Sequence, residues 1–166
     1  MKDFIDLRGC RWARNVNDVL GGNLLPLHQL KLMGESASFF GNILQSKSHL
    51  ESIKMILTRQ AHATAVDSNA LALYLKSNPD QKDELAVLTS WGPLPPYSIV
   101  ARKGLSREMK DRIVDTLLNI NYDQEGARIL SQFNVRRFAS ASVDDFKIER
   151  DLRESTRTMN FDSVYY

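Results

Sequence analysis

A cluster of polar side chains precedes an apolar run in the segment 46–57, SKSHLESIKMIL. Ser48 and Glu51 match the S-x-x-E capping box, in which the serine side chain accepts a hydrogen bond from the glutamate amide and the glutamate side chain reaches back. Capping does not account for Ser46, or for His49 in the first turn. Because a helix N-terminus carries unpaired N–H groups and a partial positive charge, hydroxyls and an imidazole placed there suit an oxyanion. The segment predicts a capped helix start, either alone or as part of an anion site.

Two further turns carry candidate ligand-binding residues. Asp67 and Ser68 follow a run of small residues in ATAVDSNAL, where a strand passes into a helix. Ligands of open α/β sheets collect at the carboxyl ends of strands, which favours a binding role for both residues. The simpler alternative is that one of them only caps the next helix. At a third turn, Gly21 and Gly22 either allow close approach of the backbone to a ligand or simply form the turn.

Few other residues suggest chemistry. The sequence contains no nucleophile elbow, P-loop, zinc motif or dinucleotide fingerprint, and we expect no cofactor. His28 and His62 have no partner at metal-ligand spacing, and Cys10 is the only cysteine, so we expect neither a metal site nor an internal disulfide. Trp91 and Tyr97 flank a proline-rich segment, where they either line a cleft or serve in packing.

The composition is typical of a globular domain that is soluble in water. The 166 residues include 43% hydrophobic and 25% charged residues, enough for one domain with a real core. The net charge of +2 is too balanced for an electrostatic nucleic-acid binder, and no apolar run is long enough to span a bilayer. Asp3 and Asp6 interrupt the N-terminus and no apolar region follows, so we expect no signal peptide and, for the chain as written, a cytoplasmic location.

Strand and helix patterns alternate along the chain, which predicts an α/β fold with crossover connections. The helix before Gly34 has Leu27, Leu30 and Met33 on one face. We expect strands within the segments 8–15, 37–44, 63–68, 84–91 and 92–102. We expect helices before Gly34 and over 50–57, 69–77, 106–120, 123–133 and 142–156, with a short strand or loop at 135–140.

Three longer segments together resemble a known family. They are DLRGCRWARNVNDVLGGNLLPLHQL (6–30), SKSHLESIKMILTRQAHATAVDSNAL (46–71) and TSWGPLPPYSIVARKGLSREMKDRI (89–113). The motifs in these segments, and their order along the chain, resemble those of the phosphonate/phosphate-type substrate-binding proteins of ABC transporters. The resemblance covers roughly residues 6 to 150. That family has a D-L-x-G-K strand, a serine-glycine loop, an S-H helix start, an A-x-x-D-S strand end and a proline-rich return strand.

The resemblance implies the type 2 periplasmic binding fold, with two lobes around a ligand cleft and no catalysis. It implies that residues 1–98 form one ligand-binding α/β lobe. Residues 99–166 would then supply the return strand and the C-terminal helices of the other, incomplete lobe. Ser48 and His49 match the S-H of the family, and Asp67 matches its acidic residue. Ser46 and Ser68 are indicated by their positions at the same strand–helix turns. The predicted ligand-binding residues are therefore Ser46, Ser48, His49, Asp67 and Ser68.

Two departures from the family pattern bear on this site. The loop serines of the family fall at Val19 and Gly21, and Asp18 adds a negative charge beside them. A neutral hydrogen bond contributes roughly 0.5–1.5 kcal/mol and one to a charged group about 1.5–3 kcal/mol, so losing two hydroxyls weakens an anion site considerably.

The second departure concerns length. The resemblance implies that the chain starts at the second lobe of the family. We therefore expect the rest of the first lobe and the secretion signal of the periplasmic or lipid-anchored family members to be missing from it, as in a fragment or short isoform of a longer protein or in a remnant. The helices after Ser106 would pack on that absent lobe. We therefore expect exposed apolar surface and either self-association or a partner chain.

Three hypotheses follow from these observations. The first is a non-catalytic solute-binding module for a small oxyanion such as phosphate or phosphonate. The second is a ligand-free interaction protein, or a fragment, that keeps the fold. The third, which has least support, is an enzyme on the same scaffold with His49 as a base, because no oriented nucleophile–base pair is evident.

Overall fold

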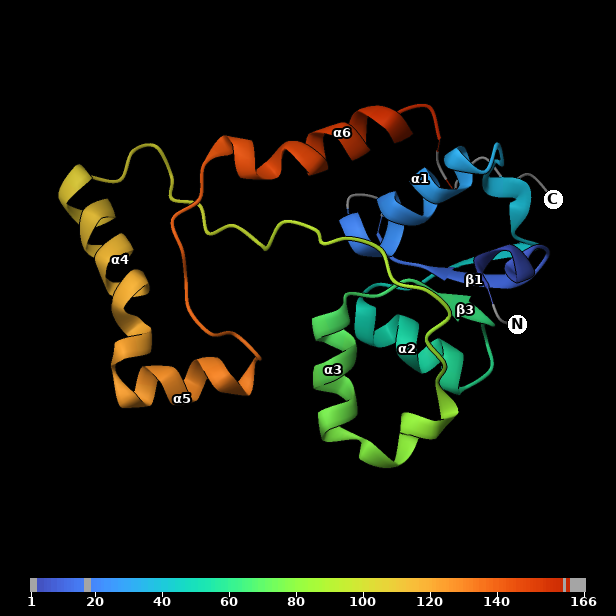
Figure 1. Ribbon diagram of the computed structural model, residues 1–166, viewed down its shortest axis with the longest axis horizontal. Helices are drawn as coiled ribbons and strands as arrows, with labels where there is room; N and C mark the ends of the chain where they lie inside the picture. The colour runs from blue at the N-terminus through green and yellow to red at the C-terminus, as the bar shows by residue number, and fades with distance from the viewer. Residues whose placement is uncertain (1–2, 17–18, 160, 162–166) are drawn as a thin grey trace. The chain divides into compact units, whose positions relative to one another are not determined.

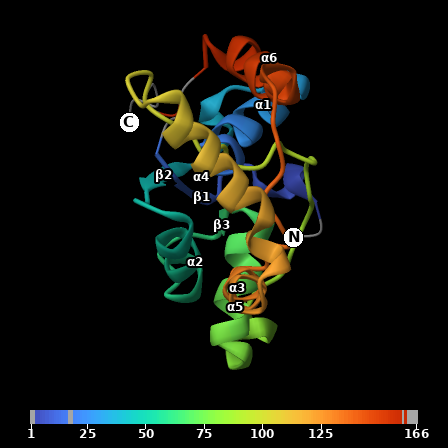
Figure 2. The ribbon, with the colours of Figure 1, turned by 90° about the vertical axis from the view of Figure 1, so that its left-hand side faces the viewer.

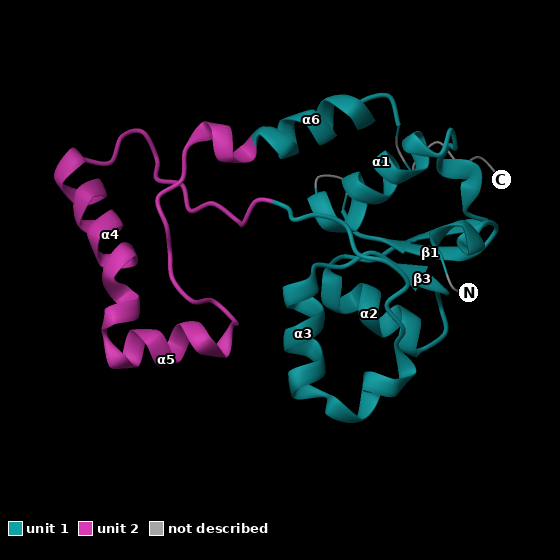
Figure 3. Cartoon of the chain, in the orientation of Figure 1, with its two compact units in different colours: residues 1–94, 147–166 teal, residues 95–146 magenta. Residues whose placement is uncertain are grey.

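The computed structural model describes residues 3–16, 19–159 and 161. The chain divides into two compact units, which Figure 3 shows in different colours. Unit 1 comprises Met1–Leu94 and Lys147–Tyr166, and unit 2 comprises Pro95–Phe146. The predicted assignment of residues 1–98 and 99–166 to two different lobes of a larger protein remains a prediction.

A parallel three-stranded sheet lies at the centre of unit 1 (Figure 1). Its strands are β1 (Arg11–Arg14), β2 (Asn42–Gln45) and β3 (Ala63–Thr64), in the order β2-β1-β3. Trp12 of β1 pairs with Ile43 of β2 and with Ala63 of β3. Parallel neighbours need crossover connections, and helices supply them here. The α/β prediction is confirmed, although each strand is shorter than the segment in which it was expected.

Helices connect the strands of unit 1. A π-helical turn at Leu20–Leu24 leads into α1 (Leu25–Leu32), α2 (His49–Leu57) follows β2, and α3 (Ser68–Ser77) follows β3. The C-terminal helix of the unit is α6 (Lys147–Thr156), and short 3-10 turns are present at Phe4–Leu7, Ala37–Phe39 and Pro79–Glu84. Gly34 follows α1 with φ at +72°, a left-handed conformation that glycine adopts at helix ends without the steric cost of a Cβ atom.

The core of unit 1 is aromatic. Trp12 and Phe40 stack with ring centroids 4.5 Å apart, and Phe4 meets the ring of Trp12 edge-on at 6.3 Å. The same cluster contains Leu7, Leu27, Leu30, Ala37, Phe39, Ala63 and Phe161. Because side chains alternate along a strand, Ala13 faces the other side of the sheet, against Met55 and Ala61. Leu27 and Leu30 of α1 are buried as predicted, whereas Met33 is 37% exposed.

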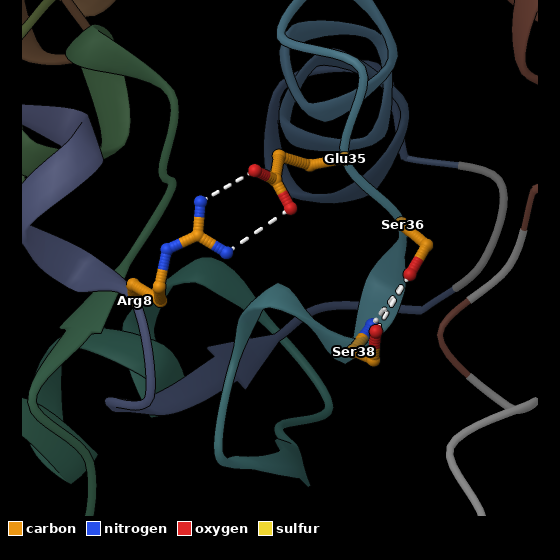
Figure 4. A network of polar contacts seen from close by, with 4 residues as sticks. All are labelled: Arg8, Glu35, Ser36 and Ser38. Carbon is orange, nitrogen blue, oxygen red and sulfur yellow. Dashed lines mark hydrogen bonds and ion pairs between the residues drawn. The ribbon is translucent and has the colours of Figure 1, made fainter.

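An ion pair connects the start of unit 1 to the end of α1 (Figure 4). The guanidinium of Arg8 donates two hydrogen bonds to the carboxylate of Glu35 and lies 4.7 Å from the ring centre of Phe39. The hydrogen bond from Arg8 lowers the pKa of Glu35. Ser36 begins the next turn, and its Oγ accepts a hydrogen bond from the Ser38 amide.

Helix α6 packs against α1 within unit 1, and both views show the two helices side by side (Figures 1 and 2). His28 Nδ1 lies 2.9 Å from Ser155 Oγ, a hydrogen bond between the two helices. The helix predicted over 142–156 is interrupted, because a 3-10 turn at Val143–Phe146 precedes α6.

The two strands predicted between residues 84 and 102 are absent. This part of the chain is fully described, and residues 85–102 form no regular element and pair with no strand. Three prolines, at positions 93, 95 and 96, remove backbone donors that a ladder needs. Leu88 and Trp91 pack against the aromatic core instead, so their hydrophobicity reflects packing rather than strand formation.

Unit 2 consists mainly of α4 (Arg107–Asn119) and α5 (Gln124–Gln132), joined by a 3-10 turn at Ile120–Tyr122. Ser106 caps α4 by accepting from the Met109 amide at 3.2 Å, and Asp123 caps α5 in the same way. Both helices match their predicted segments, and residues 135–140 are irregular. No helix within the described residues of either unit is both long enough and apolar enough to cross a membrane.

Candidate functional site

The three turns that the sequence singled out lie at the same edge of the sheet. Each follows the carboxyl end of a parallel strand, and parallel strands end at a common edge. A Cβ atom added to Gly21 would lie 2.5 Å from Asp67 Oδ1, and one added to Gly22 would lie 3.3 Å from His49 Cε1. The glycine pair therefore does more than form a turn, since it lets the backbone contact both other turns.

His49 and Asp67 form a polar pair across two of these turns. The distance between His49 Nε2 and Asp67 Oδ2 is 3.2 Å, and their side chains are only 16% and 24% exposed. Asp67 occupies the N-cap position of α3, but its side chain makes no capping hydrogen bond. Capping therefore does not account for the Asp67 side chain. The carboxylate instead meets the imidazole at the start of α2.

The other ring nitrogen of His49 has no hydrogen-bond partner within the described part of the chain. His49 Nδ1 is buried, and among the described residues it makes no hydrogen bond. Leaving a buried polar atom unpaired costs about 1–3 kcal/mol. When Nε2 donates to Asp67, Nδ1 of the neutral ring is an acceptor. The imidazole is thus fixed by Asp67 on one side and unsatisfied on the other.

Ser48 is the N-cap residue of α2, as predicted. Its Oγ accepts a hydrogen bond from the Glu51 amide at 3.1 Å. The capping box also predicts a bond from the Glu51 side chain back to Ser48. The Glu51 carboxylate instead forms an ion pair with Lys54, 4.0 Å from its Nζ. Ser48 is exposed, and its hydroxyl proton takes no part in the capping bond, so it remains able to donate to a ligand.

Ser46 and Ser68 occupy different environments. Ser46 is 1% exposed, and its Oγ donates to the Arg14 carbonyl at 2.9 Å and shares a short hydrogen bond with Ser52 Oγ. These bonds fix the turn between β2 and α2, so Ser46 has a supporting position in this structure. Ser68 is the exposed first residue of α3, beside Asp67.

Several buried polar residues near this edge were missed by sequence reasoning. Arg14 ends the central strand with 7% exposure, Asn15 follows it with 2%, and Asn23 lies in the π-helical turn with 4%. Asn15 Oδ1 accepts from the Val16 amide at 2.8 Å, which supports the chain as it leaves β1. The sequence did contain a signal for these residues. Strands of a parallel sheet are covered on both faces and are mainly hydrophobic, so polar residues at the end of such a strand indicate a special role.

The positions that depart from the family pattern lie on the same edge. Val19 precedes the π-helical turn and is half-buried, and Gly21 faces the carboxylate of Asp67. Asp18, which was expected to add a negative charge, lies outside the described residues. No group of three or more potential metal ligands occurs in the described ranges.

The chain belongs to the phosphonate-binding family of periplasmic substrate-binding proteins. The sequence model of that family, described as "ABC transporter, phosphonate, periplasmic substrate-binding protein", matches residues 1–146. Members of this family serve transporters and are not enzymes, so the enzyme hypothesis is not retained. No curated protein matches the chain at a significant level.

Solved structures show the same fold. PhnD1 from Prochlorococcus marinus (MIT 9301), in complex with methylphosphonate, matches 93% of this chain with a TM-score of 0.83 and 20% identity. XAC2383 from Xanthomonas citri, bound to chloride ion in one structure and to ATP in another, matches 95% with a TM-score of 0.68 and 17% identity. The chain spans 59% of the PhnD1 chain and 61% and 62% of the two XAC2383 chains. The predicted fold class, part of a type 2 periplasmic-binding fold, is confirmed.

Proposed function

We propose that this chain supplies the ligand-binding part of a non-catalytic module for a small oxyanion, with a phosphonate as the first candidate. The observation that carries the proposal is the convergence of Ser48, His49 and Asp67 at one edge of the sheet, beside the start of α2 and α3. The family and the methylphosphonate complex of PhnD1 support a phosphonate as the ligand. Phosphate is also tetrahedral at phosphorus, with a fourth oxygen in place of the carbon substituent, and is the second ligand to test.

The proposed binding mode uses groups that favour negative charge. The first-turn amides of α2 and the Ser48 hydroxyl would donate to the oxyanion, and hydrogen bonds to charged groups contribute about 1.5–3 kcal/mol each. Asp67 would orient His49 and accept from a ligand donor, such as the hydroxyl of a monoprotonated phosphonate. Ser68 would add a hydroxyl at the start of α3, and Ser46 would hold the turn from behind.

A thermal-shift titration of the chain with methylphosphonate, phosphate and sulfate tests this proposal. A ligand that binds only the folded state stabilises it by about 2.7 kcal/mol at 100 times its dissociation constant, which is a visible shift. We expect the double variant Ser48→Ala/His49→Ala to lose the shift and Ser98→Ala, in unit 2, to keep it. A shift that survives the double variant would place binding elsewhere.

The second candidate function is a ligand-free interaction protein. The observation in its favour is Gly21, because the Asp67 carboxylate lies against a position at which the family has a serine hydroxyl. A fixed carboxylate there repels a dianion. The same titration separates the two candidates, since a ligand-free protein would show no shift with any of the three anions.

We also propose that unit 2 binds a partner chain or a second copy of this chain through α4. Met109, Ile113 and Val114 are all at least 38% exposed, and only Gly126 and Leu130 are buried among the described residues of unit 2. Exposed apolar surface of this kind is typical of an interaction site. Sedimentation velocity of the chain alone, with Ile113→Glu beside it, tests self-association. A monomer whose apolar face is already protected from hydrogen exchange would contradict both forms of the proposal.

A further inference from the structure

A groove of about 470 Å³ lies within unit 1, outside the residues of the proposed oxyanion site. It is bounded by α1, the segment 90–94 and α6. Its lining residues are Leu25, His28, Gln29, Ser90, Trp91, Gly92, Pro93, Leu94, Ile148 and Leu152. Sites for small organic molecules typically have volumes of about 300–1,000 Å³, so the groove is of suitable size.

The lining has the chemistry of a site for an apolar group. Trp91, Leu94 and Leu152 present aromatic and aliphatic surface, while His28 and Gln29 of α1 add a few polar atoms. Binding sites for organic ligands combine mainly hydrophobic and aromatic side chains with a small number of polar groups in this way. The groove is therefore suited to an aryl or branched alkyl group rather than to a second anion.

Two of these side chains are held in place before any ligand binds. The ring of Trp91 meets Phe4 of the core edge-on, with centroids 5.1 Å apart and planes at 84°. His28 is fixed through its Nδ1 by Ser155 Oγ of α6. Side chains that are already ordered lose little conformational entropy on binding, which favours affinity.

The groove reaches the proposed oxyanion site at Gly21. A Cβ atom at this position would lie 2.5 Å from Asp67 Oδ1 and 3.9 Å from Leu94 Cδ1, and Leu94 lines the groove. Gly21 thus lies between the Asp67 carboxylate of the proposed site and the Leu94 side chain of the groove. Because glycine has no side chain, nothing at position 21 stands between the two.

We infer that the groove binds the organic substituent of the ligand, so that the ligand class is a phosphonate carrying an aromatic or bulky aliphatic group. The oxyanion end lies at Ser48 and His49, and the substituent extends past Gly21 onto Leu94 and Trp91. This inference rests on the proposed oxyanion-binding function and deepens it, since it selects among phosphonates by their apolar part.

Isothermal titration of the full chain with phenylphosphonate and methylphosphonate tests the inference. Both ligands have the same oxyanion end, so their affinity ratio reports the substituent alone. We expect phenylphosphonate to bind at least about tenfold more tightly, and a tenfold ratio corresponds to about 1.4 kcal/mol. Ile148→Asp, at the half-exposed rim of the groove, and Leu94→Asp should each reduce the ratio several-fold. The matched control Val87→Asp, 71% exposed and outside the groove, should leave it unchanged.

The outcomes separate this inference from the function on which it rests. Methylphosphonate binding without any advantage for phenylphosphonate would overturn the inference and leave the proposed function intact. A preference that both groove variants retain would place the phenyl group elsewhere and overturn it too. Binding of neither ligand would refute the proposed function of this chain together with the inference. Quenching of tryptophan fluorescence by phenylphosphonate that is lost in Trp91→Phe would support the assigned contact.

Discussion

Units 1 and 2 both contain well-formed helices, but the two units differ in what those helices pack against. In unit 1, α1 covers an aromatic cluster in which Trp12, Phe39 and Phe40 are almost fully buried. In unit 2, α4 has no buried residue, although its cap is well formed. Local signals can therefore place a helix without giving it a core. We therefore expect most of the stability to come from the buried core of unit 1, and unit 2 to gain stability if its apolar face is covered.

The largest difference should come from removing one buried and one exposed side chain. Phe40→Ala empties the centre of the aromatic cluster and should lower the free energy of unfolding by about 3–5 kcal/mol. Ile113→Ala in α4 should change it by no more than about 0.5 kcal/mol, because Ile113 is 38% exposed. Urea denaturation followed by tryptophan fluorescence measures both. Equal losses would show that unit 2 has a core of its own.

Two glycines offer a sharper comparison between the units. Gly21→Ser brings a side chain against the Asp67 carboxylate, and overpacking of this kind costs roughly 1–3 kcal/mol. Gly104→Ser in unit 2 meets only the end of the Arg102 side chain at 3.7 Å and should be nearly neutral. Thermal unfolding gives both values. A neutral Gly21→Ser would mean that Asp67 moves away freely, and the contact between His49 and Asp67 would then be weak.

The two serine caps test whether helix ends matter equally in both units. Ser48→Ala and Ser106→Ala each remove a side-chain acceptor from an N-terminal amide, a loss of about 0.5–2 kcal/mol for the helix concerned. We expect Ser48→Ala to lower global stability and Ser106→Ala to increase hydrogen exchange only within α4. If Ser106→Ala lowers the global unfolding temperature as much as Ser48→Ala, the two units unfold together.

The smallest effect concerns two exposed arginine–glutamate pairs. A hydrogen bond from Arg8 lowers the pKa of Glu35, and one from Arg128 lowers the pKa of Glu125. A lowered carboxyl pKa stabilises the folded state above the unfolded-state pKa, about 4.3 for glutamate, and this contribution is lost as pH falls through the folded-state value. Glu35→Gln should slightly reduce the acid sensitivity of unfolding, whereas Glu125→Gln should not. Identical acid profiles for Glu35→Gln and the unchanged chain would contradict the first expectation.

Local patterns predicted the helices and the three turns, because caps and amphipathic spacing act over a few residues. Ser48, His49 and Asp67 were singled out in this way, and the parallel sheet explains why the turns that carry them lie at one edge. Ser46 was harder to interpret, since its partner is the carbonyl of Arg14, 32 positions earlier in the chain. The strands expected between 84 and 102 failed for the same reason, since strand formation needs a neighbour that no local pattern reveals.

The chain returns to unit 1 at Lys147, so unit 2 is an insertion within unit 1. Unit 1 is discontinuous, and α6 rejoins α1 only after the 52 residues of unit 2. Those residues form a closed loop whose entropy cost grows only with the logarithm of its length, by about 0.6 kcal/mol for each doubling. Insertions or deletions between Pro95 and Phe146 should therefore be tolerated by unit 1, with no change at the sheet edge that carries Ser48, His49 and Asp67.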